Sequence, residues 1–241
     1  MKFNIPDEVL DVAKKLKENG YQAYLVGGCV RDILLDKKPK DWDITTNAQP
    51  EEIQKLFPDS VYENQFGTVG VKTEAVDPTS KIIEITTFRL EGKYSDKRHP
   101  DNIVFAKTIE EDLARRDFTI NALALNIRTS DVPNINVNKR TSDVQIIDSF
   151  GGQKDLKNKI IRTVGQPEAR FNEDALRLMR AVRLATELNF QIEEKTQAAI
   201  KEKANLLSMI AQERIRDELE KIIISERAAD GLRKLAELNL L

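Results

Sequence analysis

The feature that most constrains the fold is a pair of adjacent glycines between an apolar run and an amphipathic stretch. The run Ala23–Val26 is typical of a buried strand, and apolar residues recur at helical spacing from Val30 onward. Gly27 and Gly28 therefore mark a strand-to-helix turn. Such a turn exposes backbone N–H groups and a helix N-terminus, which together favour a phosphate ligand. By itself, a pair of glycines is more often simply a turn.

Two aspartates follow this turn after a short basic loop. The run Asp41–Thr46 predicts a second strand, in which side chains alternate between the two faces. Asp41 and Asp43 then point to one side and Trp42 to the other. Two neighbouring carboxylates repel each other unless a cation lies between them, so the pair favours a divalent metal site. A solvated strand edge is the ordinary alternative.

The composition excludes several kinds of chemistry. The 241 residues include one cysteine, Cys29, and one histidine, His99, so an internal disulfide and a cysteine-based zinc site are excluded. Catalysis must depend mainly on carboxylates and arginines. No apolar run reaches membrane-spanning length and no signal-peptide core is present, so we expect a cytosolic protein that does not bind a membrane. The formal net charge of −2 neither favours nor excludes nucleic acid.

The order of predicted elements divides the chain near residue 150. Strands and helices mix before this point, and the runs 66–71 and 81–88 predict an antiparallel pair. After Lys154 the patterns are helical, including one long pattern over 168–189. We therefore expect domains at 1–150 and 151–241. The chain ends in an apolar pattern, which predicts that it is truncated before further domains.

The most informative predicted helix contains several arginines. It covers Glu173–Arg183, where Asp174 and Arg177 are three residues apart and share a neighbouring face, and Arg180 and Arg183 continue the row. The ordinary interpretation is a solvated helix face with one ion pair. The alternative is base recognition, because a carboxylate acceptor beside a guanidinium donor matches cytosine and adenine. Each mismatch with uracil or guanine should cost about 1–3 kcal/mol.

Four motifs, in order, resemble those of the class II transfer-RNA nucleotidyltransferases and bacterial poly(A) polymerases. The first is the glycine turn together with the Asp-x-Asp strand that follows it. The others are the stretch Arg115–Ala122, the stretch Asp148–Gly165 and the Glu-Asp-x-x-Arg sequence that begins at Glu173. The resemblance implies an α+β fold: a polymerase-β-type head with a mixed, mainly antiparallel sheet, followed by an all-helical neck that selects the nucleotide.

The resemblance also implies roles for individual residues. Asp41 and Asp43 would bind Mg²⁺ and carry catalysis, and Glu84 is the candidate third catalytic carboxylate, although an outward strand-edge glutamate is an equal alternative. The residues implied for nucleotide binding are Gly27, Gly28, Arg31, Arg116, Asp174, Arg177, Arg180 and Arg183.

The implied activity is the addition of C and A to the 3′ end of tRNA, without a nucleic-acid template, from CTP and ATP by two-metal nucleotidyl transfer. The polar loop from Arg89 to Asp101 favours CCA addition over CC addition. An A-adding enzyme, a poly(A) polymerase, and a nucleotide-binding fragment that is inactive without missing RNA-binding domains are the alternatives. The role of a long predicted hairpin at 126–145 is left open, as is the oligomeric state.

Overall fold

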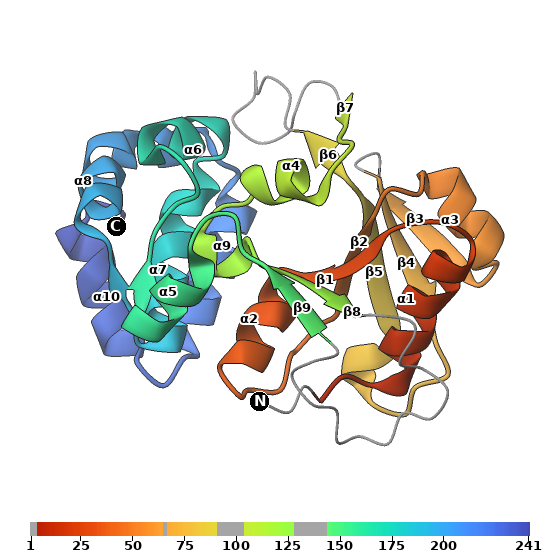
Figure 1. Ribbon diagram of the computed structural model, residues 1–241. Helices are drawn as coiled ribbons and strands as arrows, with labels where there is room; N and C mark the ends of the chain where they lie inside the picture. Colours follow the sequence, from red (N-terminus) through yellow and green to blue (C-terminus); the bar gives the residue numbers. More distant parts are fainter. Residues whose placement is uncertain (1–3, 65–66, 91–103, 128–143) are drawn as a thin grey trace. The chain divides into compact units, whose positions relative to one another are not determined.

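The computed structural model describes residues 4–64, 67–90, 104–127 and 144–241, which form two compact units (Figure 1). The first unit takes the chain up to Leu90, Val104–Leu113 and Asn121–Ser149. The second takes Ala114–Ile120 and Phe150–Leu241. The single predicted boundary at 150 does not separate these units, because the chain enters the second unit once before that point.

A seven-stranded sheet forms the first unit, in the order β3-β4-β5-β2-β1-β8-β9. Only the pair β2 and β5 is parallel, and the other neighbours are antiparallel. The strands are β1 (Ala23–Val26), β2 (Asp43–Thr46), β3 (Ser60–Asn64), β4 (Thr68–Lys72), β5 (Ile82–Thr87), β8 (Ala124–Ile127) and β9 (Val144–Ile147). The predicted mixed, mainly antiparallel sheet is confirmed, and so is the antiparallel pair β4–β5. Strand β3 was not predicted.

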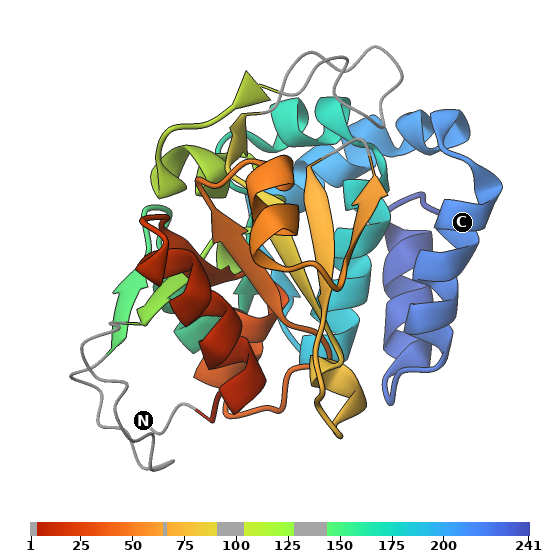
Figure 2. The ribbon, with the colours of Figure 1, turned by 90° about the vertical axis from the view of Figure 1, so that its right-hand side faces the viewer.

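Helices α1 (Asp7–Glu18) and α3 (Pro50–Leu56) pack on one face of this sheet (Figure 2). Alternation along β5 sends Ile83 and Ile85 to that face, where both are fully buried, and leaves Glu84 exposed on the other. Burial of this apolar layer stabilises the unit. The face opposite α1 and α3 is therefore where a polar site can form.

Short elements connect these strands. They are α2 (Gly28–Leu34), the 3₁₀ turn η1 (Pro78–Ser80), the two-stranded ladder of β6 (Arg89–Leu90) with β7 (Val104–Phe105), helix α4 (Ile109–Ala114) and the 3₁₀ turn η2 (Thr119–Asn121).

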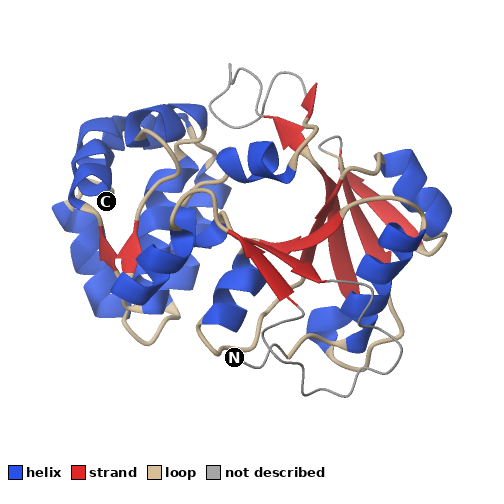
Figure 3. Cartoon of the chain, viewed as in Figure 1, coloured by secondary structure: helices blue, strands red, loops and turns tan. Residues whose placement is uncertain are grey.

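Helices dominate the second unit, as predicted. They are α5 (Gly152–Asn158), α6 (Pro167–Glu173), α7 (Leu176–Leu188), α8 (Glu194–Lys203), the 3₁₀ turn η5 (Ala204–Met209), α9 (Gln212–Ile223) and α10 (Ala228–Glu237). The expectation of an all-helical neck is wrong in one respect. Strands β10 (Ile160–Ile161) and β11 (Gln191–Ile192) form a two-residue parallel ladder among the helices (Figure 3).

The long helix predicted over 168–189 is two helices. Asp174 lies between α6 and α7 with extended backbone angles, φ −135° and ψ 107°, and its Oδ1 accepts a 3.0 Å bond from the backbone N–H of Leu176. Aspartate satisfies the free N–H groups at a helix start in this way, so it ends one helix and caps the next.

A close approach of three helices depends on one glycine. A Cβ atom at Gly231 of α10 would lie 2.5 Å from Ile222 Cγ2 on α9 and 2.8 Å from Thr186 Oγ1 on α7. Real Cβ atoms are not found at such distances, so only glycine allows α10 to pack this closely against both helices.

The segment Ala114–Ile120 pairs with the second unit through its backbone. Phe118 forms an isolated antiparallel bridge with Thr163 and is fully buried. The Thr119 N–H donates to the carbonyl of Arg162 at 2.9 Å, and its hydroxyl lies 2.5 Å from Asp155 Oδ2. These bonds fix the position of Asp117 within the second unit.

Several predicted features lie outside the described residues: His99, the loop from Glu91 to Asp101 and most of the hairpin predicted at 126–145. Among the helices that the structure does describe, none is long and apolar enough to cross a membrane.

Candidate functional site

The glycine turn adopts the predicted strand-to-helix geometry. Gly27 has φ 75° and ψ −135°, which L side chains rarely adopt, and its carbonyl accepts from the Arg31 N–H at 3.2 Å. Gly28 follows as the first residue of α2. A Cβ there would lie 3.6 Å from Arg31 Nη2 and 3.8 Å from Asp41 Oδ1, both ordinary contacts. The protein itself therefore leaves room at Gly28, beside a guanidinium and a carboxylate.

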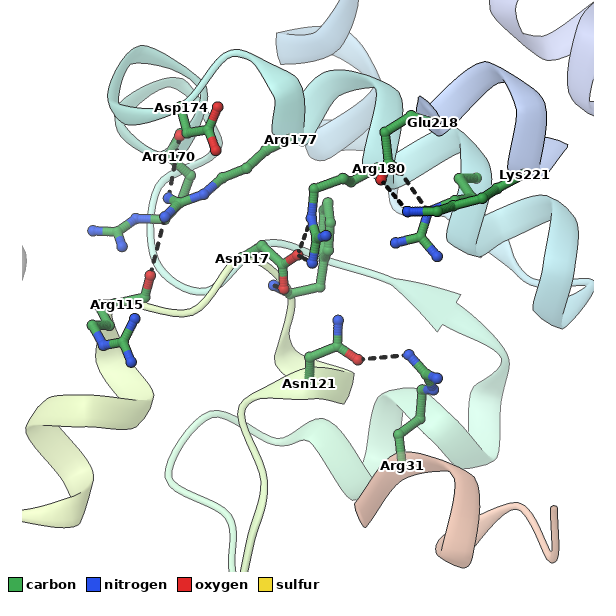
Figure 4. A network of polar contacts seen from close by, with 12 residues as sticks. Arg31, Arg115, Asp117, Asn121, Arg170, Asp174, Arg177, Arg180, Glu218 and Lys221 are labelled. Carbon is green, nitrogen blue, oxygen red and sulfur yellow. Dashed lines mark hydrogen bonds and ion pairs between the residues drawn. The ribbon is translucent and has the colours of Figure 1, made fainter. Parts of the chain in front are cut away.

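Arg31 is held in a fixed orientation. Its Nε donates to Asp32 Oδ1 at 2.8 Å, its Nη2 lies 2.7 Å from the same oxygen, and its Nη1 donates to Asn121 Oδ1 at 2.9 Å (Figure 4). Burial raises the pKa of Asp32, and the positive charges of Arg31 and Lys37 act in the opposite direction. Sequence reasoning assigned no role to Asp32, which follows the glycine turn, or to Asn121, which lies within the stretch Arg115–Ala122.

The two predicted metal-binding aspartates lie beside this turn. Asp43 begins β2 and is half-buried, Asp41 is exposed, and Trp42 between them is 2% exposed. The predicted alternation is therefore observed. Burial raises the pKa of Cys29 in α2 to about 12, and the charges of Asp43 and Asp41 contribute to this increase. Both carboxylates are thus close enough to the turn to act on one buried thiol.

Glu84 is the direct neighbour of Asp43. The parallel register of β2 and β5 pairs the two residues, so their side chains leave the sheet on the same face about 5 Å apart. Among the described residues, no group of three or more His, Cys, Asp or Glu side chains is gathered closely enough to hold a metal. Mg²⁺ is usually bound by one or two carboxylates together with waters and substrate phosphates. Asp41 and Asp43 fit that donor set.

Asp174 lies in the second unit, in the break before α7. Besides capping Leu176 through Oδ1, it lies 3.5 Å from Arg214 Nη2 through Oδ2. The prediction that Asp174 and Arg177 share one helix face is wrong, because Asp174 is outside the helix. Arg214 was not singled out from the sequence.

Arg177 is the most enclosed of the predicted nucleotide-binding arginines, with a side chain 9% exposed. Its guanidinium donates to Glu173 Oε2 at 2.7 Å and to the carbonyl of Arg170 at 3.3 Å. A third bond, 3.2 Å long, reaches the carbonyl of Arg115 (Figure 4). Arg177 therefore ties the Arg115–Asp117 turn to α7, and Arg116 is half-buried in this turn.

Arg180 and Arg183 also contact carboxylates. The Nε and Nη2 atoms of Arg180 donate to Asp117 Oδ2 at 2.8 and 2.5 Å, and this charge raises the pKa of Arg180. Arg183 donates to Glu218 Oε2 at 2.6 Å and to Glu187 Oε2 at 2.9 Å, which joins α7 to α9. The structure thus pairs Arg180 with Asp117, a partner that sequence reasoning did not assign, and gives Arg183 different partners on α7 and α9.

Comparison with known proteins places these motifs in a family. Residues 23–162, more than half of the chain, match the model of the poly A polymerase head domain. The chain belongs to this family. Residues 189–241 match a second model, described as the probable RNA and SrmB-binding site of polymerase A. The resemblance stated from the motifs is confirmed. The family is of the polymerase-β type, which uses divalent metal ions.

Curated relatives of this chain include CCA-adding enzymes. That of Lactobacillus helveticus is 47% identical over 222 residues, covering 90% of this chain and 51% of the relative. That of Geobacillus kaustophilus is 41% identical over 235 residues, covering 97% and 53%. The chain spans about half the length of the curated relatives it matches.

Solved structures of CCA-adding enzymes are also similar to this chain in fold. The Bacillus stearothermophilus CCA-adding enzyme in complex with CTP is 40% identical with a TM-score of 0.82, over 97% of this chain and 52% of that one. The Thermotoga maritima enzyme complexed with tRNA is 28% identical with a TM-score of 0.73, over 98% and 52%. The predicted α+β fold class is confirmed.

Proposed function

We propose that this chain carries the catalytic head and the nucleotide-selecting neck of an enzyme that adds C and A to the 3′ end of tRNA. The substrates are CTP and ATP, and the product besides RNA is pyrophosphate. The observation that carries the proposal is the convergence of the glycine turn and the carboxylates, with Asp41 Oδ1 3.8 Å from the space beside Gly28. The relatives solved with CTP and with tRNA support it.

In the proposed reaction, the tRNA 3′-oxygen forms a bond to the α-phosphorus of the nucleotide. The bond from that phosphorus to the pyrophosphate oxygen breaks, and the hydroxyl proton passes to solvent. Asp41 and Asp43 would hold Mg²⁺, which lowers the pKa of the hydroxyl and neutralises charge on the leaving pyrophosphate. Gly28 allows close approach of the triphosphate, and Arg31 donates to its oxygens from an orientation fixed by Asp32 and Asn121.

Glu84 has a supporting role in this proposal. Because it is the register partner of Asp43, a third negative charge lies on the same face of the sheet. That charge strengthens the attraction for a cation at the pair.

Base choice is assigned to the second unit. Asp174 would accept from the exocyclic amine of cytosine or adenine, and Arg177 would donate to the neighbouring ring nitrogen. The bonds from Arg177 to Glu173 and to two backbone carbonyls pre-organise the guanidinium for this task. Arg116, Arg180 and Arg183 stay predicted members of the nucleotide pocket. The contact of Arg183 with two carboxylates favours a role in holding α7 against α9.

A nucleotide-incorporation assay tests the proposal. A tRNA transcript ending before CCA is incubated with Mg²⁺ and labelled CTP, ATP or UTP. We expect incorporation of C and then A, with UTP excluded, and loss of incorporation in Asp41→Ala. Addition of A alone would indicate an A-adding enzyme or a poly(A) polymerase. Nucleotide binding without turnover would instead identify a fragment that depends on the part of its relatives' length that it does not span.

A further inference from the structure

We propose that a lysine rim beside the carboxylates binds the phosphates of the RNA strand whose 3′ end is extended. The lysine rim is defined as Lys40, Lys72 and Lys81, with Ile82 as its apolar centre. The inference rests on the proposed function and adds to it the place from which the acceptor strand enters. Sequence reasoning noted the basic loop before Asp41 but assigned it no role.

Strand register places part of the rim next to the aspartates. Asp43 pairs with Glu84 on β5, and Glu84 pairs with Gly70 on β4. Two residues earlier on β5, Ile82 pairs with Lys72. Because every second residue leaves a strand on the same face, Lys72 and Ile82 share with Glu84 and Asp43 the sheet face opposite α1 and α3. With strands about 4.8 Å apart, Lys72 starts roughly 10 Å from β2.

The rim is available to a ligand. Ile82 is 50% exposed, and the three lysines are exposed. Within the part of the chain that the structure describes, no ion pair joins these three lysines to a carboxylate. The neighbouring Lys38 differs, because its Nζ lies 2.6 Å from Asp77 Oδ2. Lys72 ends β4, Lys81 directly precedes β5, and Lys40 lies just before β2. Because β2 and β5 are parallel and β4 is antiparallel to them, all three positions lie at the same end of these strands.

The geometry of phosphoryl transfer decides which substrate this surface fits. The attacking and leaving oxygens lie roughly in line, on opposite sides of the phosphorus. In the sheet, β2 lies between β1 and β5, and the glycine turn follows β1. The pyrophosphate of a nucleotide held at Gly28 and Arg31 therefore leaves on the β1 side. The attacking 3′-hydroxyl must then arrive from the side of β5 and β4, where the rim lies.

Charge and shape agree with this assignment. An RNA strand carries one negative charge per phosphate and is repelled by Asp41, Asp43 and Glu84 unless cations offset them. Lysines bind backbone phosphates without recognising the base sequence. Such binding is needed here because the 3′-terminal base changes each time a nucleotide is added. Ile82 offers an apolar surface under the terminal ribose or base, and Gly70 in the adjacent strand adds no side chain above the sheet.

The test neutralises the rim in the full chain and measures RNA and nucleotide separately. The double variant Lys72→Gln, Lys81→Gln is compared with Lys55→Gln. Lys55 is exposed on α3, which covers the sheet face opposite the aspartates. Ile82→Ser is compared with Val76→Ser, because Val76 is 93% exposed in the turn between β4 and β5. Thermal melts verify folding. Fluorescence anisotropy gives the Kd for a labelled tRNA transcript that ends before CCA, and initial rates give KM for RNA and for CTP.

We expect the lysine pair to raise the Kd and KM for RNA about tenfold, with KM for CTP unchanged and kcat at saturating RNA within twofold. The slope of log K against log salt should fall by about 0.7 for each lysine removed. Ile82→Ser should raise the KM for RNA about threefold. Both controls should match the wild type.

Three results would overturn the inference: rim variants that behave like their controls, an increase in KM for CTP in place of RNA, or a wild-type chain that binds no RNA. Failure of the proposed function gives a different pattern. In that case the wild-type chain incorporates no nucleotide, while the anisotropy measurement still reports whether the rim binds RNA.

Discussion

The two units place charged groups differently. In the first, Asp41 and Glu84 are exposed on the sheet face opposite α1 and α3, and Asp41 lies next to a turn with room beside Gly28. In the second, Arg177, Arg180 and Arg183 each donate to a carboxylate of the same unit. The first arrangement suits groups that must meet the charges of a metal ion and a triphosphate. The second suits side chains that must keep a fixed orientation, because a charge-assisted hydrogen bond is strongest when it is desolvated and well oriented.

The largest effect is expected at the sheet. Asp43→Asn should lower nucleotide incorporation at least about 10³-fold, because a bound metal contributes several kcal/mol to transition-state stabilisation. The midpoint of thermal unfolding should stay the same or rise slightly, since one of two neighbouring negative charges is removed. Incorporation kinetics and a thermal melt measure both. Asp11→Asn, exposed on α1 at the other face of the sheet, is the matched control. A loss of activity below tenfold would contradict the assignment.

A smaller effect on selectivity is expected in the break between α6 and α7. Asp174→Ala and Asp174→Asn both remove the carboxylate that is proposed to accept from the base, so discrimination against UTP should fall ten- to a hundredfold. Only the alanine variant also loses the cap of Leu176, at a cost of about 1 kcal/mol in the free energy of unfolding. The ratio of kcat/KM for CTP and UTP, with urea unfolding, separates the two roles. Unchanged selectivity in both variants would exclude Asp174 from base recognition.

The arginine partners should matter more for stability than for chemistry. Arg180→Met removes the guanidinium that is hydrogen-bonded to the buried Asp117 and should lower the free energy of unfolding by about 1–3 kcal/mol. Adding Asp117→Asn should recover part of this loss, with a coupling energy near 1 kcal/mol. Urea unfolding of the wild type, both single variants and the double variant measures the cycle. Additive changes would show that the pair is not a stabilising unit.

The smallest effect is expected beside the turn. Because burial raises the pKa of Asp32 above its ordinary 3.8, the folded state binds a proton more readily than the unfolded state. Stability therefore falls as the pH rises between these two pKa values. Asp32→Asn should be no less stable than the wild type at pH 7, and the difference should disappear below about pH 4. KM for CTP should rise two- to fivefold, since Arg31 loses a charged acceptor. Clear destabilisation at pH 7 would reverse this assignment.

Local patterns predicted much of the fold. The turn at Gly27, the alternation around Trp42 and the helical second half depend on neighbours within a few residues, so the sequence contains the signal. The break at Asp174 was missed because the apolar stripe continues through it, and a capping aspartate looks like any helical aspartate in a periodicity argument. The ladder of β10 and β11 is two residues long, too short for any pattern to predict.

Partners of the site residues were harder to predict than the residues themselves. Asp117 and Arg180 are 63 positions apart, and no spacing rule connects them. The same holds for Arg31 and Asn121, which are 90 positions apart. Such pairs depend on which segments the tertiary fold brings together. The pairing of Asp43 with Glu84 was predictable in part. Both strands were predicted, but which residues of the two strands pair could not be derived from either strand alone.

The segment Ala114–Ile120 makes the two units inseparable as genetic modules. A gene fragment encoding only residues 151–241 would lack Phe118, a buried residue of the second unit, and Asp117, the partner of Arg180. A fragment ending at 150 would carry that segment without the helices it pairs with. Recombination at a single junction therefore damages both halves. We expect that swapping necks between related enzymes succeeds only when residues 114–120 are exchanged together with the helices.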